Sequence, residues 1–266
     1  MKKGKVVAAF VCASSLLLTA CATAPGAGGA SAERPVSQVP PANAAVASAK
    51  VHVDLGLAYL QIGRYAVALD EAKAALASDA SYSPAYHLMG LVYMYIDDHA
   101  AARENFQRAL AMAPSDPEFN NSYGWFQCMT GEEKEGLQRL AMAARNPYYQ
   151  TPARPYTNAG LCHLRSGDDV AAEAEFRRAA QLDAGNAQAI YHLAAIAYRR
   201  GAYTVARDYL IQLHQRNEPT AESVWLGART ERKLGNHEAE SSYLAQLRGR
   251  FADSAEFRAM NQGNYE

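Results

Sequence analysis

The apolar positions between Pro84 and Pro114 alternate between large and small side chains in a fixed order. The large ones are Tyr86, Met89, Tyr93 and Phe106, and the small ones are Gly90, Ala102 and Ala109. Small residues let a second helix approach the backbone closely, and the large ones fill the space around that crossing. Asp97 and Asp98 lie between the two halves of the pattern, where a turn is expected. The stretch therefore predicts a helical hairpin that cannot bury its apolar face alone.

The same pattern recurs along most of the chain. Its first small position is repeated at Gly56, Gly90, Gly124, Gly160, Ala194 and Gly227. The steps between these positions are 34, 34, 36, 34 and 33 residues by subtraction. The second small position recurs in step at Ala68, Ala102, Gly136, Ala172, Ala206 and Ala239. This period and this order of aromatic and small residues are typical of the tetratricopeptide repeat (TPR), a helix–turn–helix unit.

Six such copies predict an all-α fold, a right-handed α-solenoid of about six TPR hairpins over residues 49–250. In five copies the turn between the helices carries glycine, at Gly63, Gly131, Gly167, Gly201 and Gly235. Residues 251–266 are expected to form a short C-terminal capping helix and tail, because the last repeat needs a cover. The formal net charge of −1 offers no electrostatic case for nucleic-acid binding.

The first 20 residues resemble an export signal. Three lysines precede an apolar stretch of about 13 residues from Val6 to Leu18, which is too short to span a bilayer comfortably. Leu18-Thr19-Ala20-Cys21 then resembles the bacterial lipobox. That resemblance implies cleavage before Cys21 and acylation of its thiol and amine, for example with palmitate; the alternative is an ordinary secretory signal with an incidental cysteine. Ala22 stands where an aspartate would signal retention in the inner membrane, which favours the outer membrane, facing the periplasm.

Residues 21–48 are rich in Ala, Gly, Pro and Ser and nearly lack large apolar residues. Such a composition cannot bury a core, so we expect a disordered, acylated tether between the lipid and the repeats.

The third and fourth copies carry motifs more specific than a TPR consensus. They are Asn120-Asn121-x-Tyr-Gly-Trp-Phe-x-Cys128, Asn146-Pro-x-Tyr-x-Thr-Pro152 and Asn158-x-Gly-Leu-Cys162. Together with the lipobox and the six repeats, they resemble the type IV pilus biogenesis/stability lipoproteins (the PilF/PilW family). The resemblance implies a pilotin, an outer-membrane lipoprotein that helps the pilus secretin reach the outer membrane and form its ring.

Two cysteines, Cys128 and Cys162, remain after the signal segment and the lipidated Cys21 are set aside. They occupy similar places on the first helices of adjacent repeats, so we predict a disulfide if their Cα atoms lie within about 7 Å. The alternative is a pair of buried thiols. His163 has no partner motif for zinc, and no catalytic or phosphate-binding motif is present, so we expect no metal, cofactor, small-molecule substrate or enzymatic activity.

Binding is therefore the expected activity, on a groove formed by the first helices. Its predicted residues lie three positions before the first small residue of a repeat, or one, four or five positions after it. Several of them are apolar, whereas a groove that binds only water would be polar. The predicted residues are Val53, Leu57, His87, Leu91, Met94, Tyr95, Asn121, Trp125, Met129, Thr157 and Leu161. The alternative for each is packing between repeats. We expect a peptide segment of the secretin to lie along this apolar groove; the competing functions are an adaptor for another outer-membrane assembly or export complex, and an enzyme or activator acting on the cell wall.

Overall fold

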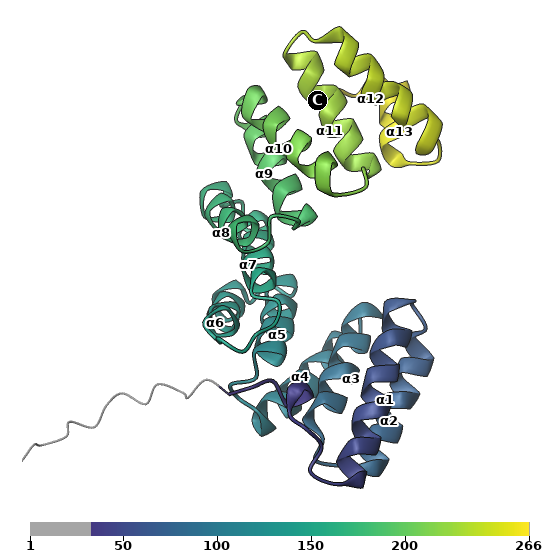
Figure 1. Ribbon diagram of the computed structural model, residues 1–266, viewed down its shortest axis with the longest axis vertical. Helices are drawn as coiled ribbons and strands as arrows, with labels where there is room; N and C mark the ends of the chain where they lie inside the picture. The colour runs from purple at the N-terminus through teal and green to yellow at the C-terminus, as the bar shows by residue number, and fades with distance from the viewer. Residues whose placement is uncertain (1–32, 266) are drawn as a thin grey trace, which may run out of the picture. The chain divides into compact units, whose positions relative to one another are not determined.

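The structure, a computed structural model, describes residues 33–265 and shows no strand among them (Figure 1). Its elements are η1 (Val36–Gln38), α1 (Ala44–Gln61), α2 (Tyr65–Ser78), α3 (Ser83–Tyr95), α4 (His99–Met112), α5 (Pro117–Met129), α6 (Glu133–Ala144), α7 (Ala153–Arg165), α8 (Asp169–Leu182), α9 (Ala187–Arg199), α10 (Tyr203–Arg216), α11 (Ala221–Lys233), α12 (His237–Arg250) and α13 (Ala255–Asn261). The predicted all-α fold is confirmed.

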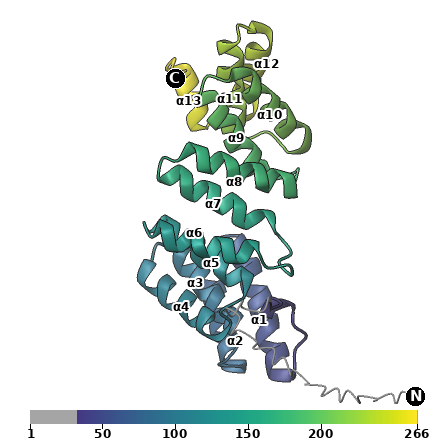
Figure 2. The same ribbon diagram turned by 90° about the vertical axis from the view of Figure 1, so that its left-hand side faces the viewer.

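The helices pair in chain order, from α1 with α2 to α11 with α12, which makes six hairpins (Figure 2). Each first helix also contacts the next first helix, from α1 with α3 to α9 with α11. The helix α13 contacts α11 in the same way, so it stands where a seventh first helix would begin. Its Met260 is buried against Val224 and Trp225 of the last hairpin, which is the covering role expected of the C-terminal segment.

The small positions lie at the helix crossings, as the pattern predicts. A Cβ atom added to Gly90 would come within 2.7 Å of the Phe106 ring. In the third hairpin both crossing residues are glycine, and a Cβ on Gly136 would lie 2.6 Å from the carbonyl oxygen of Gly124. These distances leave no room for a side chain, so the glycines set how closely the paired helices approach.

The turns inside the hairpins also follow the prediction. The five turn glycines have positive φ angles, and Gly131 has a φ of 88°. The second hairpin has no glycine there, and Asp97 adopts a φ of 60° instead. Aspartate tolerates this left-handed conformation better than most residues, which explains why the turn can form without glycine.

The expected boundary at residue 48 differs from the structure. The helix α1 begins at Ala44, where the Asn43 side chain accepts a hydrogen bond from the backbone N–H of Val46. Upstream of it, the backbone N–H of Val36 donates to the Asp116 carboxylate over 2.8 Å, and the Val36 side chain packs against two core clusters. Residues 33–48 are therefore bound to the repeats, where a disordered tether was expected, because their contacts lie far along the chain and leave no pattern in the local sequence. Residues 1–32, with the signal segment and Cys21, lie outside the described part of the chain.

Candidate partner-binding groove

A groove of about 1070 Å³ runs along the first helices of the first four hairpins. Each of α1, α3, α5 and α7 lines it with several residues, while η1 and α9 contribute only at its ends. Nine of the eleven residues predicted from the sequence lie on its wall: Val53, Leu57, His87, Leu91, Met94, Tyr95, Asn121, Trp125 and Leu161. The other two, Met129 and Thr157, do not line it. That a partner occupies the groove stays a prediction.

One row of the groove is apolar. Leu57, Leu91, Trp125 and Leu161 each follow the small residue of their repeat by one position, and each is half-buried. Tyr95 extends this apolar surface at the second hairpin, with 57% of its surface exposed and its ring stacked on Tyr65. By contrast, Met94 is buried and offers little surface to a partner. The apolar row thus repeats once per hairpin, with Trp125 as its largest side chain.

A second set of predicted residues forms the buried floor rather than open contact surface. Val53, His87 and Asn121 stand three positions before the small residue of their repeat, and all are buried. Thr157 has the same offset and is also buried, but it lies outside the groove. His87 shares a 2.9 Å hydrogen bond with Ser122 of the next first helix, and the Asn158 amide donates to the Asn121 side-chain oxygen over 3.0 Å. The sequence left packing between repeats open for each of these residues, and the hydrogen bonds of His87 and Asn121 join adjacent first helices in this way.

Burial also determines the charge of His87. Its ring lies 4.8 Å from that of Phe119, and desolvation lowers the His87 pKa to about 3. Repulsion from Arg154 acts in the same direction. The imidazole is therefore neutral at neutral pH and serves as a hydrogen-bonding residue in the floor.

The sequence reasoning missed a polar row along the other side of the groove. Lys50, Glu118, Arg154 and Gln188 stand six positions before the small residue of their repeats, and Pro84 holds this place in the second repeat as the one apolar member. All five line the groove, one turn before the row of His87 and Asn121. The same register that located the apolar row would have found them. The expectation of an apolar cradle is thus corrected: the groove has one apolar side and one polar, partly charged side.

Met129 and Thr157 have other surroundings. Met129 packs against the core cluster around Phe106, and its carbonyl oxygen accepts a hydrogen bond from Arg165 over 3.1 Å. The Thr157 hydroxyl accepts from the Asn186 amide over 2.9 Å. Both residues therefore join structural elements and do not belong to the groove wall.

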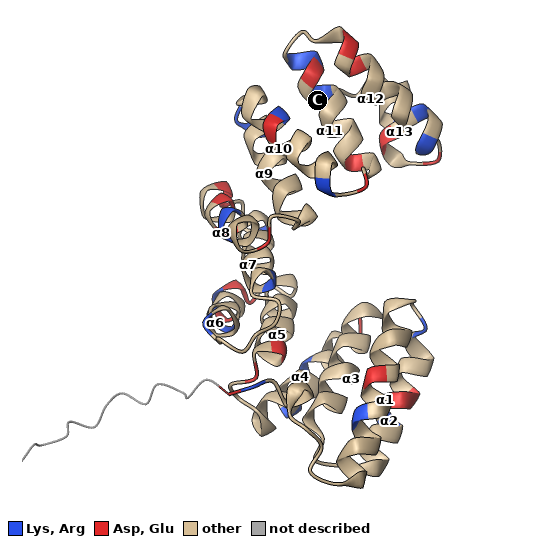
Figure 3. Cartoon of the chain, in the orientation of Figure 1, with Lys and Arg blue, Asp and Glu red and all other residues tan. Residues whose placement is uncertain are grey.

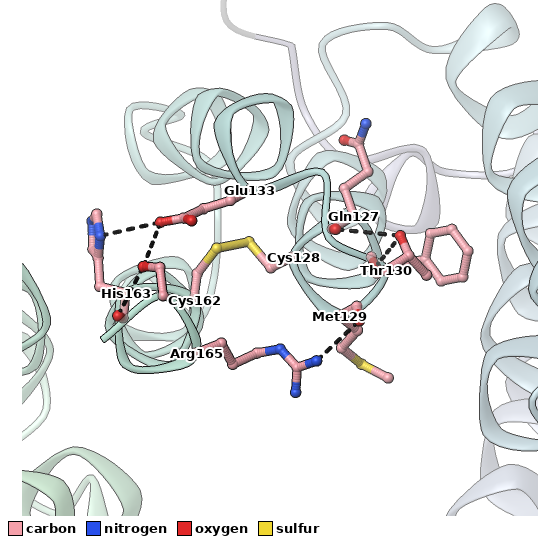
Figure 4. The surroundings of a disulfide bond; sticks show 10 residues. Gln127, Cys128, Met129, Thr130, Glu133, Cys162, His163 and Arg165 are labelled. Atoms are coloured by element: carbon pink, nitrogen blue, oxygen red, sulfur yellow. Dashed lines mark hydrogen bonds and ion pairs between the residues drawn. A yellow bond between two sulfur atoms is a disulfide. The ribbon is translucent and has the colours of Figure 1, made fainter. Parts of the chain in front are cut away.

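Cys128 and Cys162 meet between α5 and α7 (Figure 4). Their Cα atoms lie 5.4 Å apart and their sulfur atoms 2.01 Å apart, which satisfies the distance set for a disulfide. Both cysteines are buried, and Glu133 accepts a 2.7 Å hydrogen bond from the Ser166 hydroxyl beside them. His163 faces Glu133 at 3.8 Å. In residues 33–265 no group of three or more His, Cys, Asp or Glu side chains could hold a metal ion.

Two pairs of adjacent acidic residues at turns, Glu132-Glu133 and Asp168-Asp169, have structural partners. Glu132 pairs with Arg103, and Asp169 pairs with Arg199 at 2.7 Å. Asp168 caps α8 by accepting hydrogen bonds from the backbone N–H groups of Val170 and Ala171. These carboxylates therefore act as caps and ion-pair partners, at positions where a helix N-terminus favours negative charge. Within residues 33–265, no helix has the length and apolar character needed to cross a membrane.

Comparison with known proteins agrees with this architecture. The tetratricopeptide repeat family matches residues 83–116, which form the second hairpin. The type IV pilus assembly protein PilF of Pseudomonas aeruginosa is 27% identical over 207 residues, which cover 78% of this chain and 82% of PilF.

Two solved structures have the same arrangement of repeats. PilW, described as a widely conserved type IV pilus biogenesis factor, is 28% identical with a TM-score of 0.71, over 80% of this chain and 97% of PilW. The structure of Pseudomonas aeruginosa PilF is 25% identical with a TM-score of 0.73, over 83% of this chain and 100% of that chain. The resemblance inferred from the motifs is thereby confirmed: this chain is a tetratricopeptide-repeat protein homologous to PilF and PilW.

Proposed function

We propose that this chain is a non-catalytic pilotin of type IV pilus biogenesis, anchored in the outer membrane and facing the periplasm. The observation that carries the proposal is the groove along the first four hairpins of a homologue of PilF and PilW. Its partner is the pilus secretin, and its task is to bring secretin subunits to the outer membrane and favour their assembly into a ring.

The two sides of the groove define the segment that it accepts. The apolar row can contact one large apolar side chain of the partner at each hairpin, and Trp125 offers the largest contact surface in this row. The polar row places Lys50 near one end and Arg154 near the other, with Glu118 between them. An amphipathic peptide segment fits this surface, with its apolar side chains on the first row and its polar side chains on the second.

The lipid anchor accounts for the second half of the function. Acyl chains on Cys21 hold the repeats at the membrane, since two or more chains give stable anchoring. Secretin subunits bound in the groove are then concentrated at the same surface, which favours their association without any new contact.

The groove is tested by the affinity of the purified chain for the secretin. Tyr95→Ala and Trp125→Ala each remove an aromatic contact, and interface aromatics of this kind contribute about 2 kcal/mol or more. We expect roughly 30-fold weaker binding for Trp125→Ala. Leu182→Ala is the matched control, because Leu182 is 53% exposed and lies outside the groove. Unchanged affinity in both aromatic variants would show that the secretin binds elsewhere.

The anchor is tested separately with Cys21→Ser. Normal levels of secretin multimers in the outer membrane of cells carrying only this variant would contradict the tethering step. Co-purification from membranes also distinguishes the competing adaptor function: recovery of another outer-membrane complex in place of the secretin would favour it.

A further inference from the structure

The second helices of the hairpins carry aspartate and glutamate in their N-terminal halves only, alongside lysine and arginine (Figure 3). The C-terminal halves contain arginine or lysine and no aspartate or glutamate; they are residues 72–78, 106–112, 139–144, 176–182, 210–216 and 244–250. At the edge of the hairpins where these halves lead into the loops between repeats, five of the six loops carry an aspartate or glutamate, whereas the loop of residues 145–152 carries Arg145 and no acid.

The N-terminal segment is attached to this edge. The Asn146 side-chain amide donates to the carbonyl oxygen of Glu33 over 2.9 Å and to that of Ser115 over 3.4 Å. The Arg34 guanidinium lies 5.3 Å from the centre of the Tyr148 ring. Glu33 follows Cys21 by only 12 positions, so fully extended chain between them reaches about 40 Å at most. An anchor on Cys21 therefore limits the distance between this edge and the lipid surface to about 40 Å.

Large apolar side chains are exposed at the same place. Met112 at the end of α4 is 47% exposed, Met142 near the end of α6 is 46% exposed, and Tyr148 is 43% exposed. A hollow of about 310 Å³ lies between α4 and α6, and Met142 and Ala111 both line it. With the neighbouring cations they form what we call the tether patch: Arg34, Arg108, Met112, Met142, Arg145 and Tyr148.

Arg108 also pairs with Glu104 at 2.6 Å, and Glu33 is exposed beside Arg34. Asp116 nearby is buried and accepts the hydrogen bond from the backbone of Val36, and Glu175 lines the same hollow as Arg145. Arginine, methionine and tyrosine suit the boundary between headgroups and acyl chains, since each combines apolar surface with a polar or polarisable group.

We propose that the tether patch docks onto the anionic lipid surface in which the chain is anchored. The inference rests on the lipid anchor of the proposed function. The tether makes docking intramolecular, so three arginines and three apolar side chains suffice. None of the six residues lines the groove, so docking through α4 and α6 leaves the first helices open to a partner.

The two exposed methionines allow a direct test. The chain from Cys21 onward is coupled through the Cys21 thiol to a maleimide lipid in vesicles of phosphatidylethanolamine and phosphatidylglycerol. Oxidation of each methionine by dilute hydrogen peroxide is followed by mass spectrometry. We expect oxidation of Met112 and Met142 to slow by about tenfold or more relative to the chain in solution, whereas half-buried Met129 keeps its rate. Vesicles of phosphatidylcholine alone should give little protection.

The variant Arg34→Gln/Arg108→Gln/Arg145→Gln should lose the protection. Each arginine favours the docked state by about fivefold, so removal of all three lowers the ratio of docked to free chain by roughly a hundredfold. The matched control changes three exposed cations far along the chain, as Arg216→Gln/Lys233→Gln/Arg248→Gln, and should keep it.

Oxidation of Met112 and Met142 at the solution rate on anionic vesicles would overturn the proposal. Equal protection on neutral vesicles would do so as well. Since the maleimide lipid supplies the anchor, either result is independent of natural acylation and of secretin binding.

Discussion

Removal of the Cys128–Cys162 link should loosen the joint between the third and fourth hairpins. The two cysteines are 34 positions apart in the sequence, so the bond closes a loop of about one repeat. The entropy of closing a loop of this length in the unfolded chain corresponds to about 4 kcal/mol at 25 °C. Relaxation of the native joint and residual structure in the unfolded chain lower this value, so we expect a loss of about 2–4 kcal/mol for Cys128→Ala/Cys162→Ala.

For a domain of this size, each kcal/mol shifts Tm by about 2–4 °C, so the double variant should melt roughly 4–16 °C below the oxidised wild type. Thermal unfolding followed by circular dichroism measures this, with reduced wild type as the control for the substitutions themselves. Hydrogen exchange should place the loss in α5 to α8, because each repeat contacts only its neighbours.

The reasoning is refuted if oxidised wild type and the double variant unfold together. It is also refuted if both cysteines of protein recovered from cells react with an alkylating reagent under denaturing, non-reducing conditions. Either result would leave the cysteines as two buried thiols.

Two further predictions follow from the packing of the repeats. Gly90→Ala places a Cβ 2.7 Å from Phe106 and should lower the free energy of unfolding, measured in urea, by about 1–3 kcal/mol. The control Gly249→Ala in α12 meets nothing within 4 Å, so it should be neutral or slightly stabilising. Equal effects of the two substitutions would contradict the close helix crossing at Gly90. His87 should show an NMR titration with a pKa of about 3. Because folding lowers that pKa, His87 contributes its full share to the free energy of unfolding above about pH 6.5. This contribution is lost as the pH falls toward 3, by up to about 1.4 kcal/mol per pH unit. A pKa near 6.5 in the folded chain would refute the burial of His87.

The repeats could be predicted from the sequence because each hairpin uses the same spacing of large and small residues. Gly90 and Phe106 are close in sequence and meet in one hairpin, so their spacing alone predicts the crossing. The apolar row with Leu91 and Trp125 follows from the same register. The neutral state of His87 did not follow, because its burial depends on how closely α3 and α5 approach each other.

The sequence by itself determined the number of repeats, their turns and the face that carries Trp125, since these depend on residues separated by less than about one period. Only the tertiary structure decided where the N-terminal segment attaches. Asn146 holds Glu33 across 113 positions of sequence, and Asp116 holds Val36 across 80. Hydrogen bonds between residues this far apart in the sequence leave no periodic pattern, because each is made only once. Their donor and acceptor groups come together only when the stack of hairpins is complete.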